Sequence, residues 1–215
     1  MNPLLDAILV LLILTNLHLL GSSRLNACIR TVATQALLLG VLPLLTHGAD
    51  IGVRILLLMV LSTIVKAGVL PWLLRRAAHE AGVLTEVEPI VGFTTSLLLG
   101  LGLLGAALHV AGRLPLPGAS GANFLVPVAL FTVMVGMLVI VARRKAVMQA
   151  LGYLAMENGI YAFGVAFAVE EPLLVEMGVL LDVFVAVFVM GIAIHHISRE
   201  FDHIDTDKLS ALRDF

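Results

Sequence analysis

Ionisable side chains inside long apolar stretches are the residues of this sequence best placed to do chemistry. Lys66, Glu157 and Asp182 each lie near the middle of such a stretch, and Glu176 lies nearer an end. A charged side chain at membrane depth is expensive, so it commonly marks an ion or proton path or a buried pair. An acid, a base and a second acid at similar depth favour a proton relay. The alternatives are a static Lys66–Glu157 pair and, for Glu176, an interface residue.

Polar side chains recur around Glu157 at helical spacing. Gln149, Tyr153, Glu157 and Tyr161 are four residues apart, and Asn158 adjoins the glutamate. Residues four apart share one side of a helix, and this set would extend over about 18 Å at about 1.5 Å per residue. We therefore predict that Glu157 takes up and releases protons while its neighbours hold water. The alternative is that these side chains only hydrogen-bond to neighbouring helices.

Lys66 precedes Pro71 by five residues. A proline inside a helix removes one backbone donor and frees the carbonyl one turn earlier, so we predict a kink near Ala67. Such a kink would widen a wet cavity around Lys66, and its ammonium would alter the proton affinity of a nearby carboxylate. The alternative is an ordinary kinked helix end with Trp72 as an interfacial anchor.

The sequence offers few ligands for a cofactor. The single cysteine, Cys28, rules out a disulfide framework, an iron–sulfur cluster with four thiolates and a c-type haem. His18 and the pair His195-His196 fall near the ends of apolar stretches. Two of them could ligate a b-type haem, but histidines at such places more often meet headgroups and water. Phosphate-binding, dinucleotide-binding and hydrolase motifs are absent, so we expect no cofactor, no metal and no catalytic centre in this chain.

Composition places these residues in a membrane protein. The chain has 215 residues, 60% hydrophobic and only 13% charged, with a net charge of −2. Soluble domains are about 45–50% apolar and about 25% charged. No basic field for nucleic acid is present. Since about 20 apolar residues cross the hydrocarbon, we predict an all-α polytopic membrane protein with about seven transmembrane helices, at 4–20, 31–47, 55–74, 90–111, 124–142, 146–169 and 173–196.

Lysine and arginine placement predicts the orientation of these helices. Ten of the thirteen basic residues fall on one side of the predicted membrane, and only Arg54 and Arg113 fall on the other. Because the basic side faces the cytoplasm, the N-terminus is predicted outside and the C-terminus in the cytoplasm. The first stretch lacks a cleavage site, so we expect it to be retained.

Three regions follow from this order of helices. They are a four-helix membrane region (1–123), a three-helix membrane region (124–196) and a cytoplasmic tail (197–215). Leu209, Leu212 and Phe215 would share one face of a short helix in the tail. Either the tail is a frayed end, or it docks on a cytoplasmic partner subunit.

Two motifs suggest a family. They read Gly152-Tyr-Leu-Ala-Met-Glu157-Asn158-Gly159 and Val175-Glu176-Met-Gly-Val-Leu-Leu-Asp182-Val-Phe-Val-Ala-Val. The chain resembles the hydrogenase-4 component E family, membrane subunits of formate-hydrogenlyase-type, group 4 nickel–iron hydrogenases. The Lys66-to-Pro71 segment is similar to the family's third span. The ranges 1–50 and 90–130 match mainly in hydropathy and length.

The last three predicted spans are also similar to the small K-type membrane subunit of respiratory complex I, so they are expected to form a K-type-like helix bundle. Positions that fit its pattern are Arg143, Arg144, Gly152 and Asn158. The sequence departs at the key glutamate, since Leu154 stands in its place and Glu157 follows three residues later. Three residues span about 4.5 Å along a helix and keep roughly the same face, so the role can persist. Asp182 is the candidate for the second acid of that subunit.

The resemblance implies a non-catalytic subunit in the cell inner membrane. It implies neighbouring antiporter-like and other membrane-arm subunits, a soluble arm with nickel–iron and iron–sulfur centres, and redox energy coupled to proton or sodium movement. In this reading Glu157, Asp182 and Lys66 form the relay. The alternatives are a structural scaffold that joins antiporter-like subunits, or a subunit of a multisubunit cation/proton antiporter or of a complex-I-like dehydrogenase.

Overall fold

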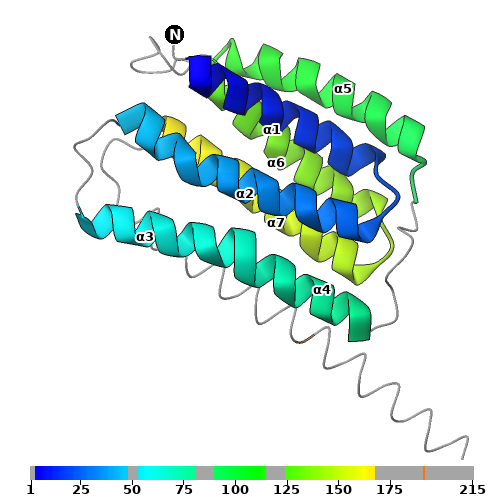
Figure 1. Cartoon of the computed structure of the whole chain (residues 1–215). Coiled ribbons are helices and arrows are strands. Elements are labelled where there is room, and N and C mark those ends of the chain that lie inside the picture. The colour runs from blue at the N-terminus through cyan, green and yellow to red at the C-terminus, as the bar shows by residue number, and fades with distance from the viewer. Residues whose placement is uncertain (1–2, 48–52, 81–89, 115–123, 168–190, 192–215) are drawn as a thin grey trace, which may run out of the picture.

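The computed structural model describes residues 3–47, 53–80, 90–114, 124–167 and 191, and within them the chain is helical, with no strand. Figure 1 shows the helices as one bundle. The elements are α1 (Pro3–Gly21), α2 (Leu25–His47), α3 (Val53–Ile64), a π-helical turn η1 (Val65–Val69), α4 (Leu70–Glu80), α5 (Phe93–Ala111), α6 (Leu125–Ala142) and α7 (Ala146–Phe167).

Helices occupy six of the predicted spans, and the predicted span 173–196 lies outside the described residues. The third span is one helical run divided by η1. Four described helices, α1, α2, α5 and α6, are long and apolar enough to cross a membrane. The other two helical runs are not both long and apolar enough. The third run is divided by η1, and polar residues lower the hydropathy of α7. An all-helical, multi-pass membrane protein is therefore supported, while the number of seven spans stays a prediction.

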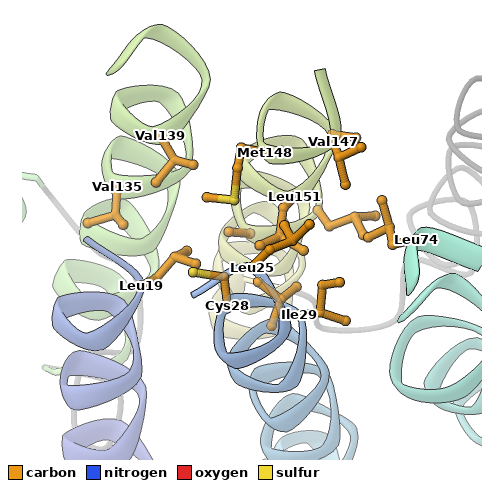
Figure 2. Packing of buried hydrophobic residues seen from close by; sticks show 14 of the residues in the cluster. Leu19, Leu25, Cys28, Ile29, Leu74, Val135, Val139, Val147, Met148 and Leu151 are labelled. Atoms are coloured by element: carbon orange, nitrogen blue, oxygen red, sulfur yellow. The ribbon is translucent and has the colours of Figure 1, made fainter. Parts of the chain in front are cut away.

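The second helix begins earlier than predicted, at Leu25 rather than at residue 31. Asn26 and Arg30 lower the hydropathy of this turn, and both side chains are exposed. Leu25, Cys28 and Ile29 point inward and are buried between helices (Figure 2). Packing on this one face extends the helix beyond the apolar stretch, because an amphipathic turn needs only one buried side.

The bundle is layered, with α5 along one edge and the α3–η1–α4 run along the opposite edge (Figure 1). Between them, α1 packs on α6 and α2 packs on α7, and α6 and α7 have the most extensive contact. Helices from the predicted regions 1–123 and 124–196 therefore lie side by side in a single bundle. The division of the chain into these regions stays a prediction.

Glycines hold α6 and α7 in close contact. A Cβ atom on Gly136 would collide with the backbone of Met156, and one on Gly159 would lie 2.5 Å from the backbone nitrogen of Val133. A Cβ atom on Gly152 would lie 2.9 Å from the carbonyl oxygen of Gly136. Small residues allow such close backbone approach between helices in lipid, where van der Waals packing drives association. This contact fixes α7 on both sides of Glu157.

Two apolar clusters fill the space between the helices. The first joins α1, α2, α4, α5, α6 and α7 and is drawn in part in Figure 2; it includes Leu19, Cys28, Leu74, Val139 and Leu151. The second joins α1, α2, α6 and α7 at the other end of the bundle; it includes Leu9, Leu12, Leu39, Leu42, Leu125, Val128 and Ala162. On α2 and α7, the stretches between the two clusters, 33–37 and 156–160, lie near the middle of the helix.

Candidate functional site

The π-helical turn η1 positions Lys66. The backbone N–H of Leu70 donates to the carbonyl of Val65, five residues earlier rather than four. Pro71 follows at once and has no N–H to donate, so the ordinary ladder is already broken here. The stretch where the sequence predicted a kink is thus a π turn, a type of irregularity often found at functional sites. It places Lys66 inward, with only 9% of the residue exposed.

Lys66 forms an ion pair with Glu157 of α7. The distance from Lys66 Nζ to Glu157 Oε1 is 2.9 Å, and the two side chains are 10% and 3% exposed. The ammonium also lies 5.4 Å from the centre of the Tyr161 ring, one turn further along α7, within range of a cation–π interaction. Within the described part of the chain, the second carboxylate oxygen, Oε2, has no hydrogen-bond donor.

A buried ion pair of this kind contributes little net stability. Desolvation of two buried charges offsets much of their attraction, and an apolar pair of similar volume is often as stable. Removing one partner, in contrast, typically costs about 3–5 kcal/mol because it leaves a buried charge alone. A carboxylate with one ammonium partner and one open oxygen can accept a proton on that oxygen when the ammonium withdraws.

The other residues of the predicted stripe on α7 have different surroundings. Asn158 is buried, and its Nδ2 donates to the carbonyl of Val32 on α2 over 3.4 Å. Tyr153 is half-buried beside the first apolar cluster. Gln149 is exposed, and its Nε2 donates to the carbonyl of Arg143 over 3.2 Å. The structure thus brings Glu157 and Tyr161 to Lys66 but does not place Gln149 beside them.

Two predicted relay residues, Asp182 and Glu176, lie outside the described residues, as do His195 and His196. In the described ranges, no group of three or more His, Cys, Asp and Glu side chains is arranged to hold a metal ion. The contacts of Lys66 and Glu157 are those of a buried ion pair.

Arg143 is a buried basic residue whose contacts the sequence did not reveal. Its NH2 group donates to the carbonyl of Leu20 over 2.7 Å, and its NH1 group donates to the carbonyl of Val91 over 3.2 Å. The guanidinium also lies 4.9 Å from the centre of the Phe93 ring. Burial lowers the pKa of Arg143 from its ordinary value, but a guanidinium remains charged in proteins. Arg143 thus fastens the ends of α1 and α6 to the start of α5.

Buried amides on other helices were also missed. Asn16 of α1 and Gln35 of α2 are completely buried and hydrogen-bonded to each other. Each amide stands inside an apolar stretch of the sequence, a signal that carries little weight until its burial is known.

These features define the class of protein: a polytopic membrane protein with a buried ion pair at the middle of its helix bundle. The family described as NADH-ubiquinone/plastoquinone oxidoreductase chain 4L matches residues 124–214, which include Glu157. Hydrogenase-4 component E of Escherichia coli (strain K12) is 30% identical over 150 residues, 70% of this chain and 69% of that protein. The same values hold for hydrogenase-4 component E of Shigella flexneri. The chain belongs to the hydrogenase-4 component E family.

An uncharacterized protein of Mycobacterium tuberculosis (strain ATCC 25618 / H37Rv) is 34% identical over 204 residues, 94% of this chain and 93% of that protein. No solved structure gives a significant match. Family membership and the apolar helices together make this chain a membrane subunit of a respiratory-type complex, as the two sequence motifs predicted.

Proposed function

We propose that this chain is a non-catalytic membrane-arm subunit of an energy-converting nickel–iron hydrogenase complex, and that it takes part in proton or sodium movement coupled to redox chemistry. The observation that carries the proposal is the buried Lys66–Glu157 pair, which lies at the middle of its helices in a chain of this family. An acid and a base buried at membrane depth suit a site on an ion or proton path.

Glu157 acts as the central protonatable group, and Lys66 controls it. The Lys66 ammonium lies 2.9 Å from Glu157 Oε1, so the ammonium and an incoming proton compete for the same carboxylate. Movement of Lys66 away from Glu157 therefore favours proton uptake, and its return favours release. Because η1 interrupts the regular helix ladder around Lys66, small backbone changes there alter the pair.

Further residues complete the proposed relay. Asp182 and Glu176 serve as further acids, and Asn158, Tyr153, Tyr161 and Gln149 hold water or orient the carboxyl group. The proposed partners are antiporter-like and other membrane-arm subunits, with the nickel–iron and iron–sulfur centres in the soluble arm. The proposed location is the cell inner membrane, with the N-terminus outside and the C-terminus in the cytoplasm.

A test replaces Glu157 in the assembled complex. Glu157→Gln keeps the volume, and its amide oxygen can still accept a hydrogen bond from the Lys66 ammonium, so Lys66 is not left without a partner; the amide cannot take up or release a proton as a carboxyl does. We expect assembly on a native gel and dye-linked hydrogenase activity to be retained, while proton movement in vesicles fails. Asp6→Asn on α1 is the matched control, because it makes the same change outside the ion pair.

The second candidate is a scaffold, and the same ion pair favours it. Lys66–Glu157 joins the outer α3–η1–α4 run to α7, so the pair can serve to hold this run in place. A scaffold predicts that Glu157→Gln disperses the complex and that proton movement is lost only as a consequence. Native gels of the variant complex therefore separate the two candidates.

A further inference from the structure

A second group of polar side chains lies in the middle of the bundle, on α1, α2 and α6. It comprises Thr15, Asn16, Gln35 and Thr132, which we call the amide cluster. Asn16 and Gln35 are completely buried, and Thr132 is 2% exposed. None of these side chains is ionisable in this environment, and the relay proposed above does not use them.

The hydrogen bonds of the amide cluster form a chain of donors that begins at Gln35. Its Nε2 donates to Asn16 Oδ1 over 2.9 Å and to Thr15 Oγ1 over 3.2 Å. Asn16 Nδ2 then donates to Thr132 Oγ1 over 2.8 Å. Both threonine hydroxyls donate to carbonyls of their own helices, each over 2.8 Å. Among the described residues, however, Gln35 Oε1 receives no hydrogen bond.

The group that would pair with Gln35 Oε1 is a hydrogen-bond donor, because an amide oxygen only accepts hydrogen bonds. Leaving a buried amide oxygen unpaired is costly, so a small donor at this point stabilises the bundle. A metal ion would need several free oxygens, but Asn16 Oδ1 and both threonine hydroxyls already accept hydrogen bonds. A water molecule needs only a few polar partners and is the usual occupant of buried polar sites.

The amide cluster lies beside the residues that flank Glu157. Asn158 donates to the α2 backbone one turn before Gln35, and Gly159 packs against the α6 turn that carries Thr132. Along α1 and α2, the amide cluster lies between residues of the two apolar clusters. Glu157 Oε2 is a second buried acceptor there without a described donor. Water in this layer would satisfy both open oxygens.

We propose that Gln35 holds an internal water molecule that donates to its Oε1, and that this water extends the proton path of Glu157 laterally toward α1 and α6. This water accepts a proton at its oxygen from a neighbouring water and gives one of its own protons to the next water in the same layer, so the amide itself is never protonated. The path rests on the function proposed above, whereas the water site does not.

The first test is a high-resolution map of the assembled native complex, which needs no variant. We expect ordered water density within hydrogen-bond distance of Gln35 Oε1. A second test uses Gln35→Met, which has similar length but no amide. We expect this variant to lose the water and to move several-fold fewer protons per hydrogen turned over. Thr31→Val, also on α2, is the control, because the Thr31 hydroxyl donates only within its own helix.

Three results would overturn the inference. One is a native map with no water at Gln35, and another is normal proton movement by assembled Gln35→Met. Should Gln35→Met not assemble, Gln35→Leu, which is shorter and also lacks the amide, takes its place; normal proton movement by that assembled variant would be the third. Failure of the relay itself is distinguishable, because Glu157→Gln would then move protons normally.

Discussion

Removing Lys66 alone should destabilise the chain more than removing both members of the ion pair. The pair is separated by 2.9 Å and is nearly inaccessible, so Lys66→Met leaves a buried carboxyl without its partner. Breaking such a pair typically costs about 3–5 kcal/mol of unfolding free energy. A second change, Glu157→Gln, removes the stranded acid and should restore much of the loss.

The assay is unfolding of the full chain in mixed micelles at increasing detergent mole fraction. The fluorescence of Trp72 is a suitable probe, because it lies on α4 directly after η1. We expect the loss of unfolding free energy in the double variant to be at least about 1.5 kcal/mol smaller than the sum of the losses in Lys66→Met and Glu157→Gln. The reasoning is refuted if the two single effects add to within about 0.5 kcal/mol, as independent sites do.

Three further predictions concern the packing of the helix bundle. Gly152→Ala should lower the unfolding free energy by about 1–3 kcal/mol in the same assay, because its Cβ would meet the α6 backbone at 2.9 Å. Gly105→Ala is the control and should leave the unfolding free energy unchanged, because its Cβ would face open space. Arg143→Leu should lower the unfolding free energy by about 1.5–3 kcal/mol, because it removes hydrogen bonds from a charged group. Arg144 is exposed, so Arg144→Leu should leave the unfolding free energy almost unchanged; equal losses in the two variants would contradict this. Tyr161→Phe keeps the ring over the ammonium and should leave stability unchanged, while Tyr161→Leu should cost about 0.5–2 kcal/mol.

Hydropathy located the helices because apolar length is a local property of the sequence. It missed the first turn of α2, since burial of Leu25 and Cys28 depends on which helices lie opposite. Pro71 indicated an irregular backbone near Lys66, but it did not reveal a π turn. That choice depends on which side chain the neighbouring helices need to face inward.

The depth of Lys66 and Glu157 was readable from the sequence, whereas their contact was not. Position along a helix gives depth, but the direction of a side chain and the identity of its neighbour come from packing. Gln149 illustrates the limit: each step of four residues turns about 40° around a helix, so it lies about 80° from Glu157. Gln35 went unnoticed because a neutral amide becomes informative only when its burial is known.

The central claim is that Glu157 carries protons while the chemistry proceeds elsewhere. The most direct measurement is the number of protons moved per hydrogen turned over by reconstituted complex, with Glu157→Gln compared with the native chain and with Asp6→Asn. Our account predicts intact complex and active hydrogenase in all three, with proton movement lost only in Glu157→Gln. An assembled Glu157→Gln complex that moves protons at the native ratio would contradict it.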